Sequence, residues 1–166
     1  MSMVLDALFE KSIPILAASL NTAVQDALLE YEQIHQTGQK GKLSHIYISF
    51  LLSGVVCKLP WLRIDLCDEN DRADITECYV CWDVSCISNE LYNNVDALAK
   101  QNKMKDYEIE QAWLTASSDY SRCFEKILPK IIDQCEAAKT ISGKWHFGQY
   151  LGSTAVVREN EKDEIF

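Results

Sequence analysis

The chain has 166 residues, 48% of them hydrophobic and 25% charged, which is typical of one globular domain with its own core. Its 16 basic and 25 acidic side chains give a formal charge of −9. That charge argues against nucleic-acid binding, which requires a basic surface, and is more consistent with a basic protein partner or with none. We expect a single domain over 1–158 and a charged, frayed tail over 159–166.

The sequence shows no signal for a membrane or for secretion. No stretch reaches the roughly 18 apolar residues that span a bilayer. The apolar run 13–20 is short and follows Asp6 and Glu10, where a signal peptide would be basic. The seven cysteines have no disulfide-framework spacing. We therefore expect a cytoplasmic protein with free thiols and no membrane contact.

Apolar residues at spacings of three and four predict a helix over 12–36. Pro14 removes a hydrogen bond and crowds the preceding turn, so we expect a break there. A short helix over 3–11 would precede the break, and Ser12 would be the N-cap of the longer helix. The polar stretch 36–42 would then connect the helix to a sheet.

Three stretches predict strands. Residues 45–52 are almost continuously apolar, which suits a strand covered on both faces. Residues 61–67 and 77–85 alternate, with Leu62, Ile64 and Leu66 on one side of the first. We expect helices to cover at least one face and part of the other.

The helical period returns after Ser88, with a modest helix to Met104 and a longer one over 106–141 that we expect to kink at Pro129. A final strand is plausible at 154–157. The predicted fold is α+β, with an antiparallel sheet of about three to four strands flanked by long N- and C-terminal helices. One stripe of the long helix should pack against the sheet; its large members are Trp113, Tyr120, Ile127 and Ile131.

Two motifs suggest metals but lack the required pattern. Cys78-x-x-Cys81 has the spacing of a zinc pair, yet a strand places these two side chains on opposite faces. The acidic loop 68–74 has Ala73 where an EF-hand needs glycine, and Tyr79 where it needs glutamate. We predict no metal and no cofactor.

Catalytic motifs are also missing. The sequence has no nucleophile elbow, P-loop, dinucleotide fingerprint or zinc-protease motif. Asp65, Glu77 and Asp83 could converge in a metal-dependent hydrolase, but the region has few of the basic residues that a phosphate substrate requires. The sequence therefore leans away from an enzyme.

The densest charge imbalance lies between 65 and 83, where seven carboxylates accompany one cation, Arg72. We expect this hairpin to have a solvent-exposed tip and to bind a basic protein, as immunity-type inhibitors and small regulators do. The leading hypothesis is thus a non-catalytic acidic binding module. Its partner-binding residues would be Asp65, Asp68, Glu69, Asp71, Asp74, Glu77 and Asp83.

The alternative hypothesis is a small enzyme or ligand-binding protein. Its pocket would form between the sheet and the aromatic segment 145–151, with Trp145, His146 and Tyr150 as pocket residues. A deep pocket with convergent polar groups would favour this alternative, and a flat acidic face over a closed core would favour the binding module.

Overall fold

The N-terminal helix α1 (Ser2–Gln36) runs through Pro14 without a break in the computed structural model, which describes residues 2–160. The predicted break and the Ser12 N-cap are wrong, because the Ser12 hydroxyl donates to the Leu8 carbonyl oxygen one turn back, at 2.9 Å. An internal proline costs about 3 kcal/mol. Burial of Phe9 and Leu16 on either side of it contributes about 1.5–3 kcal/mol each and offsets that cost.

Five strands form one mixed sheet in the order β3-β2-β1-β4-β5. The strands are β1 (His45–Phe50), β2 (Trp61–Cys67), β3 (Tyr79–Asp83), β4 (Gly143–Gln149) and β5 (Thr154–Asn160). β1 and β4 are parallel and the other neighbours are antiparallel. The predicted antiparallel sheet of three to four strands is therefore wrong in strand number and in one pairing. The helices between β3 and β4 carry the chain back to the start of β1, as a parallel pair requires.

The remaining elements are short α2 (Leu52–Val56), the 3-10 turn η1 (Asp71–Ala73), α3 (Ser85–Asn102), α4 (Asp106–Gln134) and α5 (Glu136–Lys139). The predicted strand 45–52 thus ends at Phe50, and its last residue begins α2. The predicted helix 106–141 ends at Gln134, five residues beyond Pro129.

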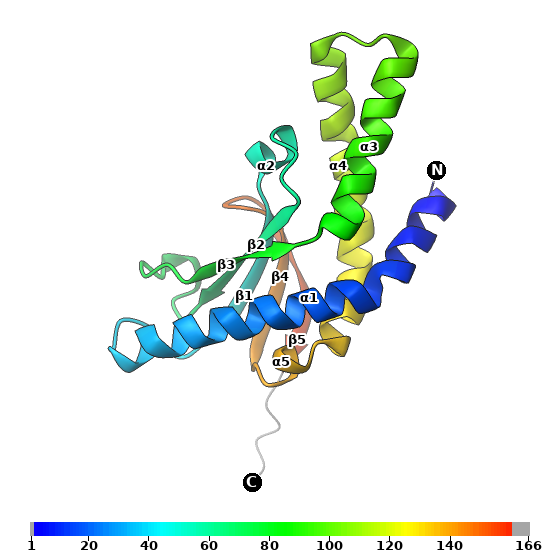
Figure 1. Cartoon of the computed structure of the whole chain (residues 1–166). Coiled ribbons are helices and arrows are strands. Elements are labelled where there is room, and N and C mark those ends of the chain that lie inside the picture. Colours follow the sequence, from blue (N-terminus) through cyan, green and yellow to red (C-terminus); the bar gives the residue numbers. More distant parts are fainter. Residues whose placement is uncertain (1, 161–166) are drawn as a thin grey trace.

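The alternation in β2 and β3 is confirmed. Ile64 and Leu66 are buried on the inner face of the sheet, and Arg63 and Asp65 lie on the outer face. Figure 1 shows α1 (blue) running across the sheet and the α3–α4 hairpin extending well beyond it. The outer face is covered in part by loops rather than by helices, so Tyr47 of β1 is buried there as well.

Phe124 of α4 joins the helices to the sheet. Its ring lies 6.2 Å from Phe9 of α1, 5.5 Å from Trp82 of β3 and 5.4 Å from Phe147 of β4, measured between centroids. Ile127 and Ile131 continue the same stripe into the core, as predicted.

The N-terminal part of α4 packs differently from the prediction. Trp113 contacts a second cluster, formed by Leu91, Tyr92 and Val95 of α3, instead of the sheet. The α3–α4 hairpin extends past the end of the sheet, and Trp113 also lies against the Lys58 ammonium, which follows α2.

The predicted tail begins inside β5, since residues 159 and 160 belong to that strand. Residues 161–166 lie outside the part of the chain that the structure describes. Among the described helices, none is both long enough and apolar enough to cross a membrane.

Replacement of Phe124 by alanine should lower the free energy of unfolding by about 3–5 kcal/mol, the usual cost of deleting a buried aromatic ring. Tyr107→Ala is the control, because Tyr107 is 65% exposed on the same helix. Urea unfolding of both variants measures the difference. Equal losses of stability would show that Phe124 does not join the layers.

Candidate ligand pocket

Asp74 in the predicted acidic surface is buried. Its carboxylate forms an ion pair with the Lys40 ammonium, and the two side chains are 4% and 1% exposed. The ammonium also donates to the Leu66 carbonyl oxygen at 3.0 Å and lies 5.3 Å from the Tyr31 ring centroid. Asp74 therefore ties the β2–β3 loop to the connection between α1 and β1.

Asp68 is buried beside it and accepts the backbone N–H groups of Gly41 at 2.9 Å and Asn70 at 2.8 Å. Burial acts to raise the pKa of Asp68. The two N–H groups and the Lys40 charge outweigh burial, so this pKa lies below its ordinary value. The prediction of a solvent-exposed hairpin tip is wrong for Asp68 and Asp74.

The other predicted acidic residues divide into two groups. Asp65 forms an ion pair with Arg63 at 2.6 Å, and Asp71 accepts the Tyr47 hydroxyl at 2.5 Å. The exposed carboxylates lie around the loop and along β3, and they are Glu69, Glu77 and Asp83.

A polar pocket of about 160 Å³ lies between the outer face of the sheet and the loops after β2 and β4. The Arg72 guanidinium joins these loops by donating to the Gly152 carbonyl oxygen at 2.9 Å and the Thr154 hydroxyl at 3.0 Å. Five of the predicted site residues line this pocket, namely Asp65, Asp71, Asp74, Glu77 and Tyr150. Lys40 and Arg63 are paired with Asp74 and Asp65, and the three cations and four carboxylates of the lining nearly balance.

The three residues of the predicted aromatic pocket are not brought together. Trp145 is buried in the core on the inner face. His146 lies on the outer face, with its ring stacked on Tyr47 at 4.3 Å and its Nε2 atom 3.1 Å from Nδ1 of His45. Tyr150 follows β4 and lines the polar pocket. A β-strand places Trp145 and His146 on opposite faces, so they cannot line one pocket.

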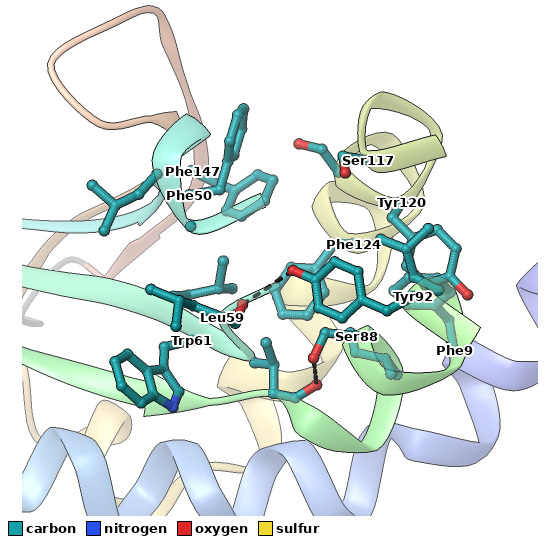
Figure 2. A pocket seen from close by; sticks show the side chains of 17 residues that line it. Phe9, Phe50, Leu59, Trp61, Ser88, Tyr92, Ser117, Tyr120, Phe124 and Phe147 are labelled. Carbon is teal, nitrogen blue, oxygen red and sulfur yellow. Dashed lines mark hydrogen bonds between the residues drawn. The ribbon is translucent and has the colours of Figure 1, made fainter. Parts of the chain in front are cut away.

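A second pocket, the apolar cavity, has a volume of about 90 Å³ and lies where the sheet meets the α3–α4 hairpin. Figure 2 shows Phe50 and Phe147 together on one side, Ser117 and Tyr120 on the α4 side, and Leu59 and Trp61 below. Its lining comes from four helices and three strands with their flanking residues: Phe9, Phe50, Leu51, Gly54, Leu59, Trp61, Leu62, Val84, Ile87, Ser88, Leu91, Tyr92, Ser117, Tyr120, Ser121, Phe124 and Phe147.

This lining contains no Asp, Glu, His, Lys, Arg or Cys side chain. Burial raises the pKa of Tyr120 to about 12, with smaller contributions from Glu90 and Cys123, so its hydroxyl stays protonated at neutral pH. Burial also raises the pKa of Tyr92. The cavity therefore presents uncharged surface and offers neither a general base nor a charged anchor.

Five side chains of the lining carry a hydroxyl group: Ser88, Tyr92, Ser117, Tyr120 and Ser121. Two of these hydroxyls have partners within the chain, and two are buried without one. Tyr92 donates to the Leu59 carbonyl oxygen at 3.1 Å, and Ser88 donates to the Val84 carbonyl oxygen at 3.2 Å. The hydroxyls of Ser117 and Tyr120 are buried without a hydrogen-bond partner in the described part of the chain. In Figure 2 the Tyr120 hydroxyl turns away from Phe50 and Phe147. Ser117 is thus the buried hydroxyl of the lining that lacks a partner and is not seen to turn away from the cavity.

Sequence patterns pointed to only part of this cavity. Phe147 lies within the predicted aromatic segment 145–151, and Tyr120 lies on the predicted stripe of α4. Ser117 is a serine in an amphipathic helix, which carries no signal of its own. Ser117 could be identified only from the position of the α3–α4 hairpin relative to the sheet, which the sequence does not show.

The alternation of β3 correctly separated the two cysteines of the C-x-x-C motif. Cys78 is buried on the inner face and Cys81 is exposed on the outer face. Within residues 2–160, no group of three or more His, Cys, Asp or Glu side chains is arranged to hold a metal ion.

Asp74→Asn should lower the free energy of unfolding by about 3 kcal/mol, because it removes the carboxylate that pairs directly with the buried Lys40 ammonium and leaves only the more distant Asp68. Glu69→Gln is the control in the same loop, since Glu69 is exposed, and it should cost less than about 0.5 kcal/mol. Chemical unfolding monitored by tryptophan fluorescence compares the two. A mild effect of Asp74→Asn would mean that the pair is open to water.

Comparisons of the chain with protein-family models, with curated proteins and with solved structures found no match.

Proposed function

We propose that this chain is a binding protein for a small, uncharged, largely apolar molecule held in the apolar cavity. The observation that carries the proposal is a lining without charged side chains that nevertheless contains the buried, unpartnered hydroxyl of Ser117. Apolar pockets with a few directed polar groups are the usual form of small-molecule sites.

The size of the cavity limits what it can hold. An engineered apolar cavity of about 150 Å³ in another protein accommodates benzene. The present cavity, of about 90 Å³, accepts a short hydrocarbon chain or part of a ring. Trp61 at its edge is 49% exposed, so a longer ligand can extend along that side. A hydroxyl or carbonyl on the ligand would satisfy Ser117.

The class of ligand is tested with three small probes: 1-hexanol, hexane and hexanoate. NMR titration should show shifts at the amides of Ser117 and Phe124 with 1-hexanol. Hexane should bind more weakly because it leaves the Ser117 hydroxyl unpaired. Hexanoate should bind weakest, since the lining supplies no countercharge for a buried carboxylate. The absence of localised shifts with all three probes would contradict the proposal.

Ser117→Ala should stabilise the protein and weaken the binding of 1-hexanol. Removal of a buried unsatisfied hydroxyl relieves about 1–3 kcal/mol, while loss of the hydrogen bond to the ligand costs about 0.5–1.5 kcal/mol of affinity. Ser118→Ala is the matched control, because Ser118 is the next residue on α4 and is exposed. Ser118→Ala should raise the free energy of unfolding by about 0.5 kcal/mol at most, because alanine has the higher helix propensity. It should leave the affinity for 1-hexanol unchanged.

Thermal unfolding and NMR titration of both alanine variants measure this pattern. Ser117→Leu supplies a further variant, which fills the cavity and should abolish binding of 1-hexanol without unfolding the protein. Unchanged affinity in both Ser117 variants would show that the probe binds elsewhere.

A basic protein partner at the hairpin is a second proposal. It is supported by the exposed carboxylates of Glu77 and Asp83, which lie beside two half-exposed aromatic side chains, Tyr79 and Trp61. Aromatic side chains are enriched at protein interfaces, and carboxylates steer a basic partner. The buried Asp68 and Asp74 take no direct part in this surface.

The triple variant Glu69→Gln, Glu77→Gln, Asp83→Asn should slow association with a native partner by about tenfold at low salt and much less near 0.5 M salt. Its fold should stay intact, because Gln and Asn keep the oxygen acceptors that bond the N–H groups of Lys42 and Ser85. Pull-down from the native cell supplies the partner, and surface plasmon resonance gives the rates. A wild-type association rate at low salt would contradict this second proposal.

A further inference from the structure

The polar pocket on the outer face of the sheet contains hydrogen-bonding groups that the chain itself leaves unused. The pocket measures about 160 Å³ and shares no lining residue with the apolar cavity. Ser49 of β1 and Arg63 of β2 line it from the sheet, and they are direct partners in the antiparallel register of these strands. The two pockets can therefore bind different molecules.

Ser49 supplies the first unused group. It lies on the outer face with Tyr47, because residues two apart in a strand share a face. Ser49 is only 2% exposed, and its hydroxyl makes no hydrogen bond within the described part of the chain. A buried hydroxyl without a partner is unfavourable, so a ligand oxygen beside it is stabilising.

The Arg63 guanidinium is held in position but only partly used. Its central carbon lies 3.8 Å and 4.5 Å from the ring centroids of Tyr79 and Tyr150. Its Nε and Nη2 atoms bond the Asp65 carboxylate, at 2.8 Å and 2.6 Å. The Nη1 atom has no partner among residues 2–160, although the side chain is only 14% exposed. Arg63 therefore offers a preorganised N–H donor to a carboxylate or carbonyl oxygen.

Asp71 of the η1 turn supplies an acceptor to the same pocket. Its Oδ1 atom accepts the Tyr47 hydroxyl at 2.5 Å and lies 3.8 Å from Nδ1 of His45. Burial and the bond to Asp71 raise the pKa of Tyr47 to about 12, so this hydroxyl stays protonated and donates. The Oδ2 atom of Asp71 has no partner within the described residues, and the side chain is 42% exposed. An ammonium group can therefore approach Asp71.

The charge of the lining restricts the class of ligand. Burial raises the pKa of Cys67 to about 11 and that of Cys78 to about 12, so both thiols are neutral. Three cations and four carboxylates remain. A cation matches the excess carboxylate but offers no anionic acceptor to Ser49 and Arg63, and an anion has the reverse problem. A molecule that carries both charges satisfies both sides of the pocket.

We propose that the polar pocket binds a free amino acid with a small side chain. The carboxylate accepts from Arg63 Nη1 and from the Ser49 hydroxyl, and the ammonium donates to Asp71 Oδ2. The volume is suitable, because an apolar cavity of about 150 Å³ in another protein holds benzene, which is about the size of L-alanine. This site is independent of the function proposed for the apolar cavity.

Four molecules of similar size separate the charge requirements: L-alanine, lactamide, lactate and alaninamide. They carry both charges, no charge, only the carboxylate and only the ammonium, respectively. NMR titration of the full chain should show the tightest binding for L-alanine, with shifts at the amides of Ser49 and Asp71. Lactamide and alaninamide should bind about tenfold more weakly, because each lacks at least one charge-assisted hydrogen bond. Lactate should bind weakest, since the lining already has an excess carboxylate.

Ser49→Ala removes the hydroxyl and should weaken the binding of L-alanine about tenfold. The fold should tolerate this change, because the hydroxyl bonds no other group in the part of the chain that the structure describes. Ser153→Ala is the matched control, since Ser153 is exposed between β4 and β5 and does not line the polar pocket. Its affinity for L-alanine should equal that of the wild type.

Asp71→Asn removes the charge that binds the ammonium. Asparagine keeps an oxygen for the Tyr47 hydroxyl and tolerates the left-handed backbone at this position, where φ is 56°. The variant should bind L-alanine about tenfold more weakly and lactate more tightly than the wild type does, because the excess negative charge is gone. Asp83→Asn is the control, since Asp83 is exposed on the same face but does not line the pocket. It should change neither affinity.

Opposite effects of Asp71→Asn on L-alanine and lactate would support the amino-acid site, and thermal unfolding checks that each variant is folded. The site is overturned if L-alanine produces no localised shifts, or if Ser49→Ala and Asp71→Asn both bind it as the wild type does. Tighter binding of lactamide or alaninamide than of L-alanine would overturn the choice of an amino acid. None of these results bears on the apolar cavity, which has its own probes and reporter amides.

Discussion

The packing of Phe124 is the contact on which both the fold and the cavity depend. Its ring touches α1 through Phe9, β3 through Trp82 and β4 through Phe147, so one side chain connects the helices to distant strands. Beyond Phe124 toward its N-terminus, α4 leaves the sheet and pairs with α3 instead. The cavity lies at this divergence, because side chains there can fill either the sheet interface or the hairpin interface but not the whole space between them.

The sequence predicted the fold where one local pattern decides the structure. Alternation in β2 and β3 placed Ile64 inside and Arg63 outside, because one face of these strands packs on helices. Local sequence patterns gave wrong predictions where contacts between distant parts of the chain determine the structure. The parallel pairing of β1 with β4 depends on the path through α3 and α4, and the continuity of α1 through Pro14 depends on what the helix buries. Neither feature can be predicted from a short stretch of neighbouring residues.

The candidate site was harder to predict for the same reason. Charge density made the hairpin look exposed, yet Asp74 is neutralised by Lys40, which lies 34 residues earlier in a polar connection with no sign of burial. Trp145 and His146 are neighbours in the sequence, but β4 places their side chains on opposite faces of the sheet. The cavity draws on residues from position 9 to position 147, so its lining follows from tertiary packing alone.

The stability of the α3–α4 hairpin bears on the cavity, because both helices of the hairpin contribute to its lining. Its own cluster, centred on Leu91, Tyr92 and Val95, is small and separate from the main core, so we expect it to open at lower cost than the core does. Leu91 and Tyr92 of this cluster line the cavity, and Ser117 lies on the other helix of the hairpin. A molecule that fills the cavity would therefore add contacts to the part of the hairpin that is farthest from the main core. Ligand binding and the order of the hairpin would then be coupled, since each favours packing of α3 and α4 around the cavity.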